Sequence, residues 1–388
     1  MKNLFIGTLL LFIGCTAQKA DIPEHIKGTK NLKVYSADPE PTASIELVQE
    51  ATFKAPEEFF LGWYDDTISL YNWLGGVEIS NSGRVYIADG KAKIIHLFAP
   101  DGRYLASKGG EGRGPGEYYG LTDTKMVSNR LHVFDFMAFR TTVYAPDSLQ
   151  VLEASTVRPP VNQEDFDEIS EWLRTMLYLR SDGTYLASFM EHWPDHRVGS
   201  PNYNLKKDRP IKYYFMNRES KIVSDKILEV RKKHADLVAQ AGDRHLANIG
   251  SLPFLARTVI EISDDNYIYT TWTDELLIKV YKPDGRYQRA MYYPIQKKVV
   301  DRNEIVSMVD VDDWHYDLIQ HAELPNTWPA IRSMISDDHN RLWVSTPVEQ
   351  EGVREWRLLE NTGALVAKFR WPDTRLIKAV KMDTPTLS

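Results

Sequence analysis

Between residues 75 and 370, apolar and polar side chains alternate in short runs that are separated by tight turns. In the first clear example, Gly83 lies in ISNSGRVYIAD with alternating apolar residues on both sides. Gly102 occupies the same place in LFAPDGRYLAS, 19 residues further along. A period of two on both sides of a turn residue is typical of a β-hairpin. Each of these segments is therefore predicted to be a pair of strands joined by a turn.

The pair of turns recurs along the chain, twice with the same spacing and twice with a longer one. The copies are Asn129 with Ser148, Asn266 with Gly285, Asn340 with Gly363, and Gly183 with Ser220. Each copy holds four predicted strands, A to D, with one tight turn between A and B and another between C and D. Four-stranded units in series are the pattern of a β-propeller.

One stretch also resembles a known repeat. Residues 75–118, GGVEISNSGRVYIADGKAKIIHLFAPDGRYLASKGGEGRGPGEY, look like an NHL-type repeat of a six-bladed propeller. The likeness rests on SGRVYIAD, on the later DG turn and on the run GEGRGPGE. Residues 328–344, WPAIRSMISDDHNRLWV, resemble the inner half of another such blade. The resemblance implies an all-β, six-bladed β-propeller of the TolB-like superfamily, but little about activity, because propellers host many functions.

Five copies of the unit are clear, and a sixth is expected from the two ends of the domain. Residues 44–53 (SIELVQEATF) would pair with residues 375–382 (RLIKAVKM), since joining N- and C-terminal strands in one blade closes the ring. The C-terminal piece is short, so a five-bladed propeller stays as the alternative.

The two faces of the predicted propeller differ in their loops. The A–B and C–D turns, on one face, are short and rich in Asp, Asn and Gly. The insertions all fall among the B–C and D–A connections of the other face: residues 190–210, 159–174, 231–251 and 296–328, the last three with helix-like patterns. Long loops on a rigid scaffold usually carry binding surfaces. This second face is therefore predicted to bind a partner, although the insertions could instead only cap the channel.

The N-terminus resembles an export sequence. Lys2 precedes an apolar run over residues 4–13, which has the length of a signal-peptide core and is too short to cross a bilayer. The run ends in Gly14-Cys15, which resembles a bacterial lipobox and implies cleavage before Cys15 and lipidation of its thiol. Cys15 is also the chain's single cysteine, so no internal disulfide can form. An ordinary cleaved signal or an uncleaved anchor remains the alternative.

Charge and composition along the chain also bear on the expected partners and domain order. Net charge is −7 with both signs mixed along the chain, so nucleic acid is not an expected partner. Residues 1–14 are predicted to be a lipoprotein signal peptide, residues 15–44 a polar tether, and residues 45–388 a single propeller domain. The expected location is the bacterial cell envelope, at the outer membrane, with the N-terminal lipid in the membrane.

Histidines in the insertions are the first candidates for chemistry. His192 and His196 flank Trp193 at a spacing that could present two imidazoles to one metal on a helix, but Pro194 favours a polar loop. The candidate binding face comprises Arg113, His192, Trp193, His196, His245, His315 and His321. Four further residues of the insertions could join a metal site, although exposed helix faces would look the same: His234, Asp243, Asp312 and Asp313.

Other motifs favour structural roles. The glycine-rich loop 109–120 lacks the features of a nucleotide-binding motif and is expected to connect two blades. The aspartate pairs Asp264-Asp265 and Asp337-Asp338 are expected to form A–B turns, whereas Asp65-Asp66 has no assigned role. There is no GxSxG and no HExxH in the chain.

The sequence thus leaves two functions open. The first is a cell-envelope binding or scaffold module for an unknown protein, peptide or glycan, without a predicted cofactor or catalytic residue. The second is a metal-dependent lyase or hydrolase at the channel mouth, which could use calcium or zinc.

Overall fold

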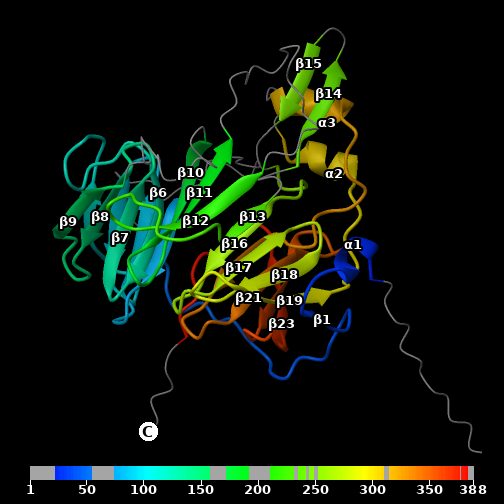
Figure 1. Cartoon of the computed structure of the whole chain (residues 1–388), viewed down its shortest axis with the longest axis horizontal. Helices are drawn as coiled ribbons and strands as arrows, with labels where there is room; N and C mark the ends of the chain where they lie inside the picture. The colour runs from blue at the N-terminus through cyan, green and yellow to red at the C-terminus, as the bar shows by residue number, and fades with distance from the viewer. Residues whose placement is uncertain are drawn as a thin grey trace, which may run out of the picture.

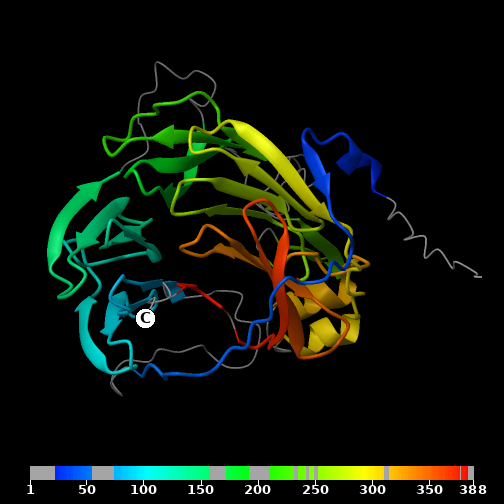
Figure 2. The same ribbon diagram turned by 90° about the horizontal axis from the view of Figure 1, so that it is seen from below.

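Five blades, each with four antiparallel strands, stand around a common axis in the computed structural model, as Figures 1 and 2 show, and one blade carries a fifth, parallel strand at its outer edge. The structure describes residues 22–54, 74–157, 172–191, 210–230, 235–241, 244–248, 252–309, 314–375 and 377–382. Each sheet is formed by four consecutive strands in chain order, and the sheets follow one another around the axis. The described part of the chain is therefore a β-propeller with five complete blades.

The blades contain the strands that the alternation predicted. Blade 1 is β2 (Leu74–Ile79), β3 (Val85–Asp89), β4 (Ile94–Phe98) and β5 (Tyr104–Gly109); blade 2 is β6 (Leu121–Val127), β7 (Arg130–Asp135), β8 (Arg140–Tyr144) and β9 (Val151–Thr156); blade 3 is β10 (Trp172–Leu179), β11 (Tyr185–Glu191), β12 (Ile211–Met216) and β13 (Leu228–Val230); blade 4 is β16 (Thr258–Ile262), β17 (Ile268–Trp272), β18 (Leu276–Tyr281) and β19 (Tyr287–Tyr293); blade 5 is β20 (Ser333–Ser336), β21 (Leu342–Pro347), β22 (Val353–Leu359) and β23 (Leu365–Pro372).

The predicted turn residues lie at the strand junctions because the junctions need positive φ angles. Gly83 (φ 74°) and Asn266 (φ 66°) close A–B turns, and Gly102 (φ 87°) closes a C–D turn. Glycine and asparagine adopt this left-handed conformation at the lowest cost. The sequence prediction of paired turns in each unit is confirmed.

The N-terminal segment is docked on the propeller for much of its length. After α1 (Glu24–Lys27), strand β1 (Leu32–Val34) adds in parallel to the outer strand β19 of blade 4. Tyr35 then stacks on Tyr293 with ring centroids 4.7 Å apart. The sequence predicts a polar tether over residues 15–44, whereas residues 32–35 within it are docked on blade 4, because β19 offers an unpaired edge.

Neither segment of the expected sixth blade forms a strand. Residues 44–54 pass from blade 5 to blade 1, where the Phe53 ring packs against Phe98. Residues 377–382 cross between the same two blades near the axis, in red in Figure 2. Both segments pack on the tryptophan-rich face of blade 5, one through Ile45 and the other through Ile377, Val380 and Met382. The expected strand pairing is therefore wrong, whereas the expectation that the two ends meet at the closure is confirmed.

The insertions of blades 3–5 build a small module beside the ring. It comprises the hairpin β14 (Leu237–Ala241) and β15 (Arg244–Asn248) with α2 (Arg302–Ser307) and α3 (Trp314–His321), at the top of Figure 1. Their apolar faces share one buried cluster that includes Phe254, Leu318 and Trp328. Helices in 296–328 were predicted correctly. The helix-like pattern of residues 231–241 instead ends in a strand, and residues 172–174 begin β10, because strand pairing outweighs a weak local helical period.

None of the helices in the described part of the chain has the length and apolar character needed to span a lipid bilayer.

Candidate functional site

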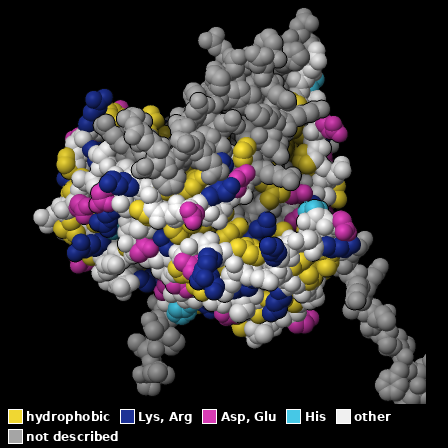
Figure 3. Space-filling model, viewed as in Figure 1, with side chains coloured by type: hydrophobic (Ala, Val, Ile, Leu, Met, Phe, Trp, Pro, Cys, Tyr) yellow, Lys and Arg dark blue, Asp and Glu magenta, His cyan; other side chains and the backbone are white. Residues whose placement is uncertain are grey.

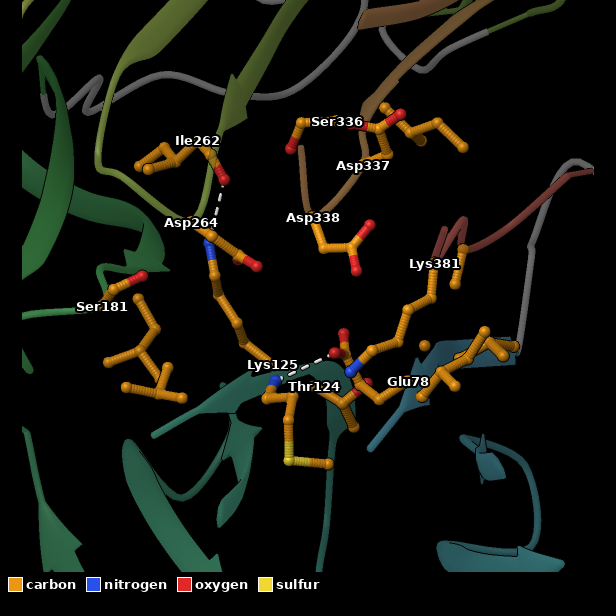
Figure 4. A pocket seen from close by; sticks show the side chains of 18 of the residues that line it. Glu78, Thr124, Lys125, Ser181, Ile262, Asp264, Ser336, Asp337, Asp338 and Lys381 are labelled. Atoms are coloured by element: carbon orange, nitrogen blue, oxygen red, sulfur yellow. Dashed lines mark hydrogen bonds between the residues drawn. The ribbon is translucent and has the colours of Figure 1, made fainter. Parts of the chain in front are cut away.

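A cavity of about 490 Å³ lies on the propeller axis. Its wall is formed by the inner strands of all five blades and by residues 378–381 of the C-terminal segment, which lie between blades 5 and 1. The lining runs from the middle of these strands to the A–B turns. Figure 4 shows the charged side chains that face it. The described lining therefore places the cavity at the face with the short turns.

Two glutamates on the wall link neighbouring blades. Glu78 of blade 1 accepts a hydrogen bond from the Met126 N–H of blade 2 (2.9 Å). Glu261 of blade 4 accepts from the N–H and the hydroxyl of Ser336 in blade 5 (3.0 and 2.7 Å). Each glutamate stands two residues before the serine that begins its A–B turn. This repeated position gives both side chains a structural role at blade contacts as well as a place on the cavity wall.

Lys125 extends across the cavity from blade 2. Its ammonium group donates to the Ile262 carbonyl of blade 4 (2.9 Å), as the dashed line at the upper left of Figure 4 shows. Four carboxyl groups interact electrostatically with this single ammonium: Glu78, Asp123, Glu261 and Asp264. The inner part of the cavity thus has more potential negative charges than Lys125 alone can balance.

Burial changes the acidity of these carboxyl groups. Loss of hydration raises the pKa of Glu78 to about 8 and that of Asp123 to about 7, with Lys125 opposing both shifts. Burial also raises the pKa of Glu261 and Asp264. The Asp123 side chain is exposed to the cavity that it lines. Near neutral pH the cavity can therefore take up or release protons.

The mouth of the cavity is a ring of polar groups from equivalent turn positions. Asn81, Ser181, Asp264 and Asp338 each follow the first residue of an A–B turn, in blades 1, 3, 4 and 5. Figure 4 shows Asp264, Asp338 and Lys381 directed into the same space. Amide, hydroxyl and carboxylate oxygens accept hydrogen bonds, so this ring suits a ligand that brings donors.

Of the candidate residues from the sequence that the structure describes, none lines this cavity. Arg113 is exposed on the loop between blades 1 and 2, with its guanidinium 5.7 Å from the Tyr119 ring centroid. His315 is buried in α3, and His321 at the end of α3 has its Nδ1 2.8 Å from the Asp317 carbonyl oxygen. His245 belongs to β15. The remaining candidates lie outside the described residues: Asp65, Asp66, His192, Trp193, His196, His234, Asp243, Asp312 and Asp313.

The expected turn aspartates have divided roles. Asp337 is buried and holds its turn together, because it accepts hydrogen bonds from the Arg341 side chain and the Trp343 indole. Asp264 and Asp338 belong to turns as expected, but they also face the cavity, which the sequence prediction missed. The glycine-rich loop connects β5 to β6 as predicted, and the Gly114 N–H donates to the Glu117 carboxylate within it (2.7 Å).

The described parts of the chain contain no cluster of side chains that could bind a metal ion. Among those residues, no three His, Cys, Asp or Glu side chains lie together in a way that could hold a metal ion. The metal-dependent enzyme stays a prediction from the sequence.

Charged side chains are mixed on the outer surface. Over the described part of the face in Figure 3, Lys and Arg side chains alternate with Asp and Glu side chains, and they form no continuous basic stripe there.

The blades and their axial cavity define a protein class, the β-propellers. A family model described as a 6-bladed β-propeller matches residues 69–240, a little under half of the chain. That model has six blades, whereas the described residues form five, with residues 44–54 and 377–382 crossing the remaining interval. No curated protein matches the chain.

Solved structures similar to this chain are distant. A Bacteroides fragilis protein that has been inferred to be exported is 12% identical to this chain. The match covers 88% of this chain and 80% of that chain, with a TM-score of 0.43. A calcium-binding protein, regucalcin from Agrobacterium tumefaciens, is 10% identical over 78% and 75% of the chains (TM-score 0.35). Virginiamycin B lyase from Staphylococcus aureus is 13% identical over 83% and 72% (TM-score 0.33). These similarities are too distant to transfer a site or an activity.

Proposed function

We propose that this chain is a binding module of the bacterial cell envelope, held to a membrane by lipidated Cys15, and that its ligand binds at the mouth of the axial cavity. The cavity is the observation that carries the proposal. Its volume of about 490 Å³ falls in the range of small-ligand pockets. Its wall carries convergent carboxylate, amide and ammonium groups, which select for a polar ligand rather than an apolar one.

The face predicted from the sequence differs from the face that this proposal uses. Long insertions favoured the B–C and D–A side, where α2, α3 and the β14–β15 hairpin lie. The cavity favours the A–B side, because all five A–B turns contribute to its wall. A protein, peptide or glycan partner would therefore present a polar group to the short-turn face.

The docked N-terminal segment supports a defined orientation at the membrane. Six residues lie between Cys15 and residue 22, and this distance of seven residue steps spans about 25 Å when fully extended. Residues 32–34 are fixed to the outer strand of blade 4. If Cys15 is lipidated, this docking keeps the outer edge of blade 4 within reach of the lipid.

Replacing Asp264 with Asn is expected to weaken ligand binding at least tenfold and to leave folding unchanged. Asp264 faces the cavity, and within the described residues its carboxylate accepts no hydrogen bond; its charge interacts electrostatically with Lys125, Asp338 and Lys381, so an amide of the same shape should leave the hydrogen bonds between blades in place. The measurement is isothermal titration of a panel of neutral oligosaccharides and short peptides into the full chain.

The neighbouring Asp265→Asn variant is the matched control. Its carboxylate accepts from Ser263 within the turn, and it does not line the cavity. If the affinity for a ligand is unchanged by Asp264→Asn but lost on Arg113→Ala, the binding site lies on the insertion-rich face instead.

Labelling with radioactive palmitate is expected to mark the wild-type chain and not the Cys15→Ser variant. Cys15 is the single thiol of the chain, so its removal leaves no second position for thioether-linked lipid. The measurement is autoradiography of whole-cell protein after both chains are expressed to equal levels in a bacterial host. Equal labelling of both chains would refute lipidation at Cys15.

A further inference from the structure

The C-terminal residues 377–382 occupy the cavity mouth as an extended segment without belonging to a strand. The Lys381 ammonium donates to the Asn81 side-chain oxygen of blade 1 (2.7 Å). One residue later, the Met382 N–H donates to the Asp338 carboxylate of blade 5 (2.8 Å). Side chains of two blades thus bind one ammonium group and one adjacent backbone N–H, which is a pattern that recognises a peptide and not only a charge.

The charges around Lys381 favour an ammonium group at this position. Asp264 interacts electrostatically with both Lys381 and Asp338, and Lys381 offsets the mutual repulsion of the two carboxylates. A lysine ammonium has three donors, of which Asn81 takes one. The Asp264 carboxylate accepts no hydrogen bond within the described residues, so the mouth offers an acceptor that the resident lysine does not use.

The resident segment is held less firmly than a blade strand. All six of its residues are half-buried, and none is enclosed in the core. Ile377, Val380 and Met382 rest on the apolar face of blade 5, which is a contact of moderate size. Lys378 is placed near Arg332, and burial together with this like charge lowers the pKa of Lys378. This repulsion opposes the docking of the segment.

We propose that the cavity mouth recognises an extended peptide of a partner protein through a lysine side chain, and that residues 377–382 are an internal occupant which such a peptide displaces. This inference rests on the binding function proposed above and names its ligand class. The Asn81, Asp264 and Asp338 side chains take the lysine and the following N–H, and the apolar face of blade 5 takes the flanking side chains.

Any partner peptide must compete with the segment that already occupies the mouth. A segment joined to its site by a short linker has an effective concentration on the order of millimolar. A free peptide with the same contacts therefore binds the wild-type chain weakly. Weakening the contacts of the resident segment should expose the site and raise the affinity for a free peptide.

The experiment measures fluorescence anisotropy of a labelled hexapeptide, Ile-Lys-Ala-Val-Lys-Met, whose sequence is that of residues 377–382. The Lys381→Gln variant of the full chain is expected to bind it at least tenfold more tightly than the wild-type chain. Adding Asp264→Asn to that variant should weaken binding at least tenfold. A hexapeptide with Gln in place of its second lysine should lose binding to a similar extent.

Lys368→Gln is the matched control variant. Lys368 forms an exposed ion pair with Asp38 on blade 5, away from the mouth, so its loss should leave peptide affinity at the wild-type value. Circular dichroism of each variant establishes that the propeller is folded.

Hydrogen exchange of the wild-type chain tests the same idea without a substitution. The Met382 amide is expected to exchange at least a hundredfold faster than amides of the buried strand β21, because the segment opens without unfolding a blade. Exchange at equal rates would show that residues 377–382 are a fixed part of the ring and would overturn the proposal.

Two further outcomes separate this inference from the binding function. If the hexapeptide binds no variant while another ligand of the panel binds in an Asp264-dependent manner, the lysine-peptide inference fails and the binding function stands. If no ligand of the panel responds to Asp264→Asn, both fail.

Discussion

Replacing Asp135 with Ala is expected to destabilise the propeller by about 4 kcal/mol. Asp135 is fully buried at the end of β7, and its carboxylate accepts hydrogen bonds from four backbone N–H groups. These belong to Tyr119 and Gly120 before β6, and to Met137 and Ala138 in the following turn. Each buried donor that loses its acceptor costs about 1–3 kcal/mol, and some of the four will find water.

Thermal unfolding checks this expectation, with a fall in Tm of about 5 °C for a chain of this size. Asp135→Asn should cost less, about 1–2 kcal/mol, because an amide oxygen can keep the three bonds made by Oδ1 and loses the one from Tyr119 to Oδ2. Asp89 has the equivalent place in blade 1 and, among the described residues, accepts from two N–H groups, so Asp89→Ala is the matched comparison and is expected to have a smaller effect. Equal losses for Asp89→Ala and Asp135→Ala would contradict this account.

The alternating pattern was sufficient for the blades because each hairpin is a local structure. Asn129, Asn266 and Asn340 all have positive φ at A–B turns, which asparagine tolerates better than other non-glycine residues. The turn residues and the two-residue alternation therefore predicted the same strands in every copy of the repeated unit. Local consistency of this kind is what allows strands to be assigned without contacts between distant residues.

Segments whose structure depends on distant partners were predicted less well. The sequence RKKHADLVAQA has a helical apolar period, yet Leu237–Ala241 forms a strand against β15, with α3 packed beside the hairpin. The closure was mispredicted for a related reason. Residues 44–53 and 375–382 contain strand-like apolar residues, but both use them to cover Trp343 and Trp356 of blade 5.

The cavity residues were missed because ring formation brings them together. Glu78 and Glu261 are far apart in the sequence, and each looks like an ordinary polar position in an alternating strand. One feature of the sequence could have found them. Both glutamates stand two residues before the serine of an A–B turn, and the inner strand of every blade lines the axis of a propeller. Comparing the blades position by position would have placed both glutamates on the channel wall.

Replacing Glu78 with Gln is expected to stabilise the chain by an amount that grows as the pH rises from about 4.5 to about 8. The folded chain has a Glu78 pKa of about 8, compared with about 4.5 when unfolded, because burial disfavours the carboxylate. The folded state therefore binds this proton more tightly. The stability that results is fully present below pH 4.5 and is lost as the pH rises through about 8. Glutamine cannot ionise, and its amide oxygen can still accept from the Met126 N–H.

Urea unfolding at pH 5, 7 and 8.5 measures this effect. The free energy of unfolding of Glu78→Gln should approach that of the wild-type chain at pH 5 and exceed it by about 2 kcal/mol at pH 8.5. Each unit of pKa shift corresponds to about 1.4 kcal/mol, and solvent in the cavity reduces the stabilisation below the value that the whole shift would give. The charges that face Glu78 are Asp123, Lys125 and Asp264, and Asp123 titrates in the same range. Glu261→Gln should change stability with the same sign, because Glu261 has the equivalent place in blade 4 and burial also raises its pKa. Parallel stability curves for the wild-type chain and Glu78→Gln would mean that Glu78 stays ionised in the folded propeller, with Lys125 as its counter-charge.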